Sequence, residues 1–294
     1  MASSGRGSGA RNTARRALLA GLGVFALVLI WEGYKAIDGR ILGWQLPARA
    51  DDRSMPHVWS MIQKFGDPEA RGSSRTVGAV VLDGAWHTFL VAAAGFVVGV
   101  VVGLGLAVVM QRFKVAERGL LPFVILSQTV PLVALAPLVV GWGGRLELFG
   151  MGWRPWMSVA AIAGYLAFFP VSVGALRGLQ SPAPASVELM RSYAASNTQT
   201  LFRLRFPSAL PYIVPALKLG AAAAVVGAIV AEISTGQRGG IGRLIIEYSR
   251  QGTSDPVKVY TAMFGAAALG LVVGASVALF DKVAMRHRPK EQAA

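Results

Sequence analysis

The sequence predicts an all-α membrane protein with six transmembrane helices. Of its 294 residues, 54% are hydrophobic and only 15% are charged, whereas a water-soluble domain carries about 25% charged residues. Four runs of 22 or 23 residues contain no charged side chain, and about 20 apolar residues suffice to cross a membrane. The runs are continuous rather than alternating, which excludes a membrane β-barrel. They are residues 88–110, 120–142, 155–176 and 259–280.

Two weaker runs complete the six spans. Residues 17–37 are interrupted by Glu32 and Lys35, and residues 212–233 hold one charged residue near each end. The first of these runs is predicted to be an uncleaved signal anchor, because its apolar part is long and no small-residue cleavage site precedes the charged turn at Glu32 and Lys35. A twin-arginine export signal just before it is the weaker alternative.

The positive charges predict the orientation. Lys and Arg are packed into short loops and tails on the side that holds both termini, which is typical of the cytoplasmic side. Residues 1–16 and 281–294 are therefore predicted to be basic cytoplasmic tails, and the first is rich in Gly, Ser, Ala and Arg and predicted to be disordered. The loop 177–211 would also be cytoplasmic, within a core that spans 85–280, and the loop 38–84 would be external.

The external loop contains a short amphipathic pattern. Val58, Met61, Ile62 and Phe65 recur at helical spacing. The pattern predicts a surface helix that packs on its own bundle. A helix that lies in the membrane interface is the less favoured alternative.

The second span carries a ridge of small residues. Gly95, Gly99 and Gly103 follow one another at intervals of four, which lets two helix backbones approach closely in a membrane. We expect this ridge to pack within the chain rather than against a second subunit.

The third span is predicted to be a kinked helix. Pro131 and Pro137 each remove a backbone donor, and Ser127, Gln128 and Thr129 stand just before the first proline. Such a helix is tolerated where neighbours or water satisfy the freed carbonyl groups. Either the three polar side chains line a pathway, or the serine and threonine bond back to their own helix and the glutamine caps a neighbour.

Two carboxylates lie close to the hydrocarbon. Glu32 and Glu232 both fall at the predicted external ends of their spans, where a charged group reaches water easily. Lys35 follows Glu32 by about one turn, which predicts a local ion pair. Glu232 has no such neighbour and is the preferred candidate for a structural or gating role near the outer mouth of a pathway.

Several kinds of chemistry are excluded. Cysteine is absent, and the three histidines have no partner at metal-ligand spacing. No Gly-Lys pair ends a phosphate-binding loop. We therefore expect no cofactor, no metal and no enzymatic activity. The net charge of +14 comes mostly from basic residues at helix ends and in loops, so nucleic acid is not an expected partner.

Residues 188–211 resemble the cytoplasmic EAA loop of ABC importer permeases. That motif has an acidic residue, a small residue two positions on, a glycine four further and a Leu-Pro pair thirteen after the glycine. The corresponding residues here are Glu188, Met190, Ala194 and Pro207. The acid, the spacing and the proline are kept, and the small residue and the glycine are not.

Two other segments share the resemblance. Residues 124–144 and 231–245 are similar to segments of the nitrate, taurine and aliphatic-sulfonate branch, and the whole likeness covers roughly residues 56–280. It implies a permease in the bacterial inner membrane that works by alternating access beside a second permease, either the same or different. A separate ABC ATPase would hydrolyse ATP. A periplasmic or lipid-anchored binding protein would deliver a small solute such as nitrate, a sulfonate, taurine or a pyrimidine precursor.

The chemistry of the loop agrees with docking on an ATPase. We expect a continuous short helix through Ala194, because alanine would strain a left-handed turn. Pro207 and Pro211 are predicted to end this helix. An apolar ridge with a charged rim suits a groove on a soluble partner, and anionic lipid is the alternative partner. The ridge is Leu189, Tyr193, Leu201 and Phe202, and the rim is cationic, made of Arg191, Arg203 and Arg205.

A secondary transporter driven by an ion gradient is the alternative function. Such proteins favour inverted repeats and ionisable groups near the middle of the membrane. Neither is apparent in the sequence.

Overall fold

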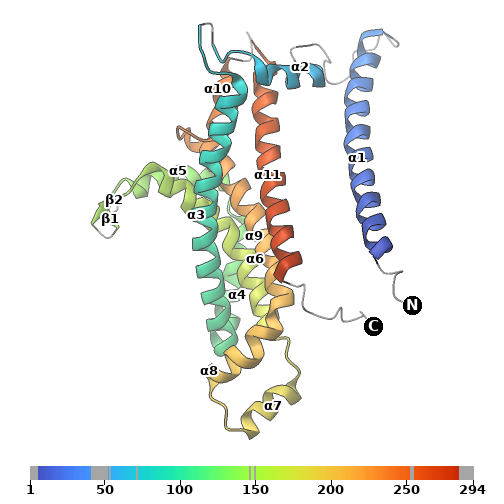
Figure 1. The fold of residues 1–294 in the computed structure, drawn as a ribbon. Coiled ribbons are helices and arrows are strands. Elements are labelled where there is room, and N and C mark those ends of the chain that lie inside the picture. The colour runs from blue at the N-terminus through green and yellow to red at the C-terminus, as the bar shows by residue number, and fades with distance from the viewer. Residues whose placement is uncertain are drawn as a thin grey trace. The chain divides into compact units, whose positions relative to one another are not determined.

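The computed structural model is almost entirely helical, as predicted (Figure 1). It describes residues 6–40, 52, 54–70, 72–145, 147–148, 150–251 and 255–284. The long helices are α1 (Arg6–Arg40), α3 (Val77–Arg112), α6 (Pro155–Leu179), α9 (Phe206–Thr235) and α11 (Val257–Ala284). The shorter ones are α2 (Val58–Gln63), α4 (Lys114–Leu126), α5 (Leu132–Gly143), α7 (Pro184–Ser192), α8 (Asn197–Thr200) and α10 (Ile241–Arg250). Between them lie the 3₁₀ turns η1 (Lys64–Gly66) and η2 (Ser127–Thr129), the π-helical turn η3 (Leu201–Arg205), and the short antiparallel pair β1 (Glu147–Leu148) and β2 (Met151–Gly152).

Four helices in the described residues are long and apolar enough to cross a membrane: Val77–Arg112, Pro155–Leu179, Asn197–Thr235 and Val257–Val277. The predicted third span, 120–142, is not a single kinked helix. Its two parts, Lys114–Thr129 and Leu132–Gly143, are bent by 103°. The break falls at Pro131, whose ring disfavours the helical conformation for the residue before it, and Val130 is extended with φ −70° and ψ 124°. The count of six spans stays a prediction.

The chain divides into two compact units, one of residues 1–78 and 248–261 and the other of residues 79–247 and 262–294. In the first unit, α1 begins at Arg6, within the segment 1–16 for which disorder is predicted. Alanine and arginine are strong helix formers, and no proline interrupts the segment. Residues 1–5 lie outside the described residues.

The ion pair predicted between Glu32 and Lys35 is replaced by longer-range partners in the first unit. Glu32 lies 2.7 Å from Nδ1 of His57 and accepts a hydrogen bond from the Val58 N–H at 2.9 Å, while Lys35 pairs with Asp52. The first N–H groups of a helix lack partners within the helix. Glu32 supplies one of these partners to α2.

The amphipathic helix predicted in the loop 38–84 forms as α2. Met61 is buried, and its carbonyl oxygen accepts a hydrogen bond from Thr261 at 3.1 Å. Ile62 is exposed rather than on the packed face. In the turn that follows, Lys64 lies 2.7 Å from Asp255 and 3.1 Å from Asp67. Burial alone would lower the pKa of Lys64, but the two carboxylates outweigh it and the pKa is raised.

The glycine ridge packs within the second unit, which confirms that prediction. It faces α6: a Cβ added to Gly99 would lie 2.7 Å from the carbonyl oxygen of Gly164, and one added to Gly103 would lie 2.9 Å from that of Phe168. Gly95 faces the same helix one turn earlier. The backbones of α3 and α6 are therefore in contact, and a side chain at any of these positions would separate them.

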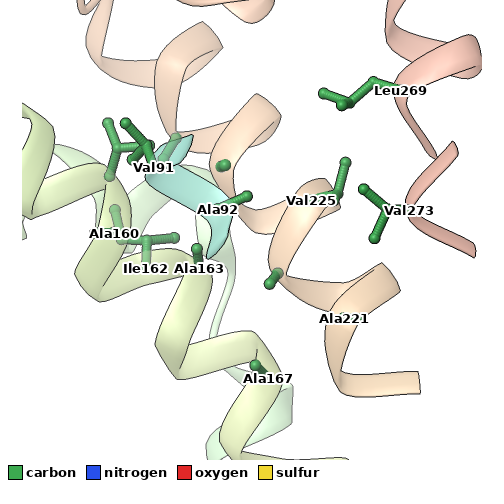
Figure 2. Packing of buried hydrophobic residues seen from close by; sticks show 14 of the residues in the cluster. Val91, Ala92, Ala160, Ile162, Ala163, Ala167, Ala221, Val225, Leu269 and Val273 are labelled. Atoms are coloured by element: carbon green, nitrogen blue, oxygen red, sulfur yellow. The ribbon is translucent and has the colours of Figure 1, made fainter. Parts of the chain in front are cut away.

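Small residues also build the core where α3, α6, α9 and α11 meet (Figure 2). Ala92, Ala163 and Ala221 come from three different helices, and Leu269 and Val273 point from α11 toward α9. Because alanine side chains are small, the axes of these helices lie close together. This core fixes the relative positions of the helices that carry the candidate site.

Candidate functional site

The loop 177–211 folds as two helices joined by a turn, and the prediction of one continuous helix is wrong. Helix α7 ends at Ser192, and Ala194 has a φ of +52°. The Ala194 N–H donates to the Arg191 carbonyl oxygen at 2.8 Å, and the Ala195 N–H donates to that of Met190 at 3.0 Å. This pair of bonds is the Schellman motif that ends many helices, usually with glycine in the left-handed position. Ala194 thus occupies the conformation that the glycine of the EAA motif would favour.

Helix α8 begins with a capping box. Ser196 Oγ accepts a hydrogen bond from the Gln199 N–H at 3.2 Å, and the Ser196 N–H donates to the Gln199 side chain at 2.8 Å. These bonds satisfy donors at the start of the helix. Two local signals therefore separate α7 from α8. Figure 1 shows α7 set off from the long helices of its unit, at the bottom of the view.

Three large apolar side chains are exposed on the part of the loop between α6 and α9. Tyr193 is 78% exposed, Phe202 63% and Leu189 57%. Leu201, predicted to lie with them, is instead half-buried against the cluster that contains Ala209. The charged residues Glu188, Arg191 and Arg203 are exposed beside the apolar side chains.

Pro207 and Pro211 do not end the helix, contrary to prediction. The helical segment runs from Asn197 to Thr235, with Pro207 in the first turn of α9 and Pro211 inside it. The π-helical turn η3 precedes Pro207, and the Phe206 N–H bonds five residues back to Leu201. A π turn shifts the hydrogen-bond register by one residue, which accommodates a residue without an N–H.

The base of the loop is closed by contacts between α6 and α9. Arg205 Nη1 donates to the Leu179 carbonyl oxygen at 2.8 Å, so Arg205 is not on the exposed charged rim. Ser181 donates to the carbonyl oxygen of Gly178 at 2.8 Å. A Cβ on Gly178 would lie 2.9 Å from the Cα of Ala209. The two ends of the loop therefore cannot separate without breaking the packing of α6 on α9.

The polar triplet lies at the break between α4 and α5. Ser127 Oγ donates to the Val124 carbonyl oxygen at 2.7 Å, and Thr129 Oγ1 donates to that of Leu126 at 2.8 Å. Both hydroxyl groups therefore bond back to their own helix, as one of the two alternatives predicted. Gln128 is exposed and lies 3.4 Å from the Ser127 hydroxyl.

Glu232 is buried, and the prediction that it reaches water at the end of its span is wrong. Only 2% of the residue is exposed. Thr88 Oγ1 lies 2.9 Å from both carboxylate oxygens, and the Gly242 N–H donates to Oε2 at 2.9 Å. The chain reverses through Gly236 and Gly239, whose φ values are +66° and +102°, and returns α10 over the carboxylate.

Sequence reasoning missed Thr88 and the α10 backbone as partners of Glu232. The residues are separated by 144 and 10 positions, and a single sequence contains no pairing signal over the longer distance. Closely spaced glycines at 236, 239, 240 and 242 were the available signal for a tight turn.

Comparison with known proteins assigns the chain to a family. Residues 95–286 match the family described as "Binding-protein-dependent transport system inner membrane component". The chain belongs to this family. This permease is therefore a membrane component of an ABC importer, from a family of transport permeases, and it is a multi-pass membrane protein.

Several curated relatives resemble this permease. The formylaminopyrimidine transport permease protein ThiX of Halalkalibacterium halodurans is 29% identical over 208 residues, which cover 69% of this chain and 77% of the relative. A probable ABC transporter permease of Haemophilus influenzae is 31% identical over 77% of this chain and 89% of its own length. The taurine transport permease TauC of Escherichia coli is 32% identical over 49% of this chain and 46% of its own.

A solved structure shares the fold of this permease. It is the crystal structure of an amino acid ABC transporter with histidines, with a TM-score of 0.55 and 17% sequence identity. The match covers 70% of this chain and 94% of that chain.

Proposed function

We propose that this permease forms half of the translocation pathway of an ATP-driven importer for a small polar solute, and that it works by alternating access. In this proposal, ATP is hydrolysed by a separate ABC ATPase, a periplasmic or lipid-anchored binding protein delivers the solute, and a second permease completes the pathway. The chain would cross the bacterial inner membrane six times, with both termini and the loop 177–211 in the cytoplasm.

The observation that carries this proposal is the exposed apolar surface of the loop between α6 and α9. Leu189, Tyr193 and Phe202 are exposed on a polar, charged segment, and large apolar side chains grouped in this way are typical of a protein interface. The packed base of the loop would pass a movement of α7 to α6 and α9. We infer that the loop docks on the ATPase, with Glu188 and Arg191 at the rim of the contact.

The break between α4 and α5 is the proposed wall of the pathway. A bent pair of helices exposes backbone groups that need water or a neighbour. Of the polar triplet, Gln128 and Thr129 are exposed and Ser127 is half-buried, so Gln128 and Thr129 would present their side chains to the solute. Glu232 would mark one end of this pathway.

The names of three relatives support the proposed class of solute: they specify formylaminopyrimidine, aliphatic sulfonates and taurine. Each of these is a small polar molecule. We propose a solute of this kind, with nitrate as a further candidate and with the choice among them made mainly by the binding protein.

Uptake into proteoliposomes that hold the permease, its ATPase and its binding protein tests the coupling surface. Phe202→Arg and Glu188→Arg are expected to lower ATP-dependent uptake at least tenfold, because each places a new charge in the proposed contact. Val115→Arg is the matched control, since Val115 is 85% exposed beside basic residues outside the loop. Normal coupled uptake by both loop variants would show that the loop does not dock on the ATPase.

A further inference from the structure

The hydrogen bonds of Glu232 join α9 to two other helices, an arrangement that a pathway-lining role does not explain. We propose that Thr88 and Glu232 form a latch that holds the first turn of α10 against α3 and α9. The latch consists of these two side chains and the backbone N–H groups of Ile241 and Gly242. The proposal deepens the role of Glu232, and it rests on the proposed function only in placing Glu232 at one end of the pathway.

The direction of each bond shows how the latch is built. The Ile241 N–H donates to Thr88 Oγ1 at 2.9 Å, and the Thr88 hydroxyl donates its single proton to the Glu232 carboxylate. The Gly242 N–H donates to the same carboxylate. The first N–H groups of a helix have no partner within the helix. Here α3 and α9 supply the acceptors that the start of α10 needs, so the position of α10 depends on both helices.

Glycine makes the close approach possible. A Cβ on Gly240 would overlap the Glu232 carboxylate, and one on Gly242 would lie 2.5 Å from the Ile229 carbonyl oxygen. Both residues are buried. The backbone of this turn therefore lies directly on the end of α9, where any side chain would lift it away.

The chemistry of the latch suits a contact that opens. A buried carboxylate is costly, and well-packed apolar residues are often at least as stabilising. A cavity of about 180 Å³ lies beside Glu232 and is also lined by His87, Gln237 and Arg238. A water molecule in the liquid occupies about 30 Å³, so this space accommodates several. When α10 lifts, water and the side chains that line the cavity can satisfy the carboxylate.

A cysteine beneath α10 reports whether the latch holds. Val81 is 3% exposed. Its side chain and that of Ile241, the first residue of α10, both pack on Gly265, where an added Cβ would overlap Val81 and lie 2.9 Å from Ile241. The chain contains no cysteine, so Val81→Cys introduces a single thiol. Its reaction with a soluble maleimide is measured on the purified full chain in lipid nanodiscs. Thr88→Val keeps the shape of the side chain and removes the hydroxyl, and it is expected to accelerate labelling at least tenfold, equivalent to about 1.4 kcal/mol.

Two control variants test whether faster labelling comes from loss of the Thr88 hydroxyl, rather than from a change in side-chain volume or in general stability. Thr88→Ser keeps the hydroxyl and is expected to label within about twofold of the parent. Ser234→Ala removes a hydroxyl near Glu232 that bonds to its own helix at Val230, 2.8 Å away, and should leave the rate unchanged. An unchanged rate in Thr88→Val, or an equal increase in Thr88→Ser, would overturn the proposal.

Glu232→Met provides a second test if Thr88→Val does not fold. Methionine keeps about the length and volume of the glutamate side chain but offers neither the Thr88 hydroxyl nor the Gly242 N–H a strong acceptor, so faster labelling is expected. A rate equal to that of the parent contradicts the latch. Labelling needs no transport, so its outcome is distinct from that of the uptake assay.

Discussion

Replacing Ala194 by glycine is expected to stabilise the turn that ends α7. Ala194 has a φ of +52°, and the left-handed conformation costs a residue with a Cβ roughly 1–2 kcal/mol. The two hydrogen bonds that close the turn join only backbone atoms of Met190, Arg191, Ala194 and Ala195. Glycine therefore keeps both bonds and removes the strain.

The net gain is smaller than the strain, because glycine loses more conformational freedom on folding, about 0.5–1 kcal/mol. A stabilisation of about 0.5–1 kcal/mol remains, which corresponds to roughly two- to fivefold less frequent opening of the turn. Ala194→Val should act in the opposite direction, since a β-branched residue is a true outlier at positive φ.

Amide hydrogen exchange of the loop, measured on the full chain in nanodiscs, checks this expectation. The amides of residues 194 and 195 should exchange about two to five times more slowly in Ala194→Gly. Ala195→Gly is the matched control, because Ala195 has a negative φ and gains only the flexibility of glycine. Equal shifts in the two glycine variants, or faster exchange in Ala194→Gly, would refute the reasoning.

Three further predictions concern the bundle, the loop and the first unit. Gly99→Val is expected to lower the thermal midpoint in detergent by several degrees or to prevent folding, because its Cβ would lie 2.7 Å from a carbonyl oxygen of α6. Gly105→Val is the control and should leave the midpoint unchanged, because a Cβ there meets no described atom of another helix within 4 Å. Equal losses of stability in the two variants would contradict this prediction. Arg205→Met is expected to reduce uptake per ATP hydrolysed about two- to tenfold while the chain still folds, because it removes the hydrogen bond to Leu179 at the base of the loop. An unchanged ratio of uptake to ATP hydrolysis would exclude a role of Arg205 in passing movement from the loop to the helices. The raised pKa of Lys64 means that its pairing stabilises the fold fully below the ordinary value of 10.5 and is lost as the pH rises through the raised value. The thermal midpoint should therefore fall over that range, and Asp255→Asn should reduce the slope; identical slopes would rule out this pairing as the cause.

The helical class and the ridge of Gly95, Gly99 and Gly103 could be predicted from the sequence. The length of an uncharged run follows from the thickness of the membrane. A four-residue interval places all three glycines on one face of a helix whatever lies around it. Both features depend only on residues near one another in the sequence, so the tertiary fold does not change them.

The break at Pro131 and the turn at Ala194 could not be predicted with the same reasoning. Proline bends some membrane helices and interrupts others, and the outcome depends on which neighbours satisfy the freed backbone groups. For Ala194, the strain of the Cβ argued for a helix, but the two capping bonds and the capping box of Ser196 outweigh it. The partners of Glu232 lie on α3 and α10, and only the tertiary fold brings them together.

The contact between α6 and α9 has a mechanical consequence. The segment from Asn197 to Thr235 is helical throughout, and a helix of that length extends about 58 Å at 1.5 Å per residue. Its backbone is held against α6 at Gly178 and at Gly227, so it can pivot only together with that helix. A rigid arm of this length moves its far tip by about 1 Å for each degree of tilt at its near end. Phe202 and Glu232 are about 45 Å apart along this helix, so a tilt of about one degree at Phe202 would displace Glu232 by about 0.8 Å. A displacement of that size is enough to break a hydrogen bond of Glu232.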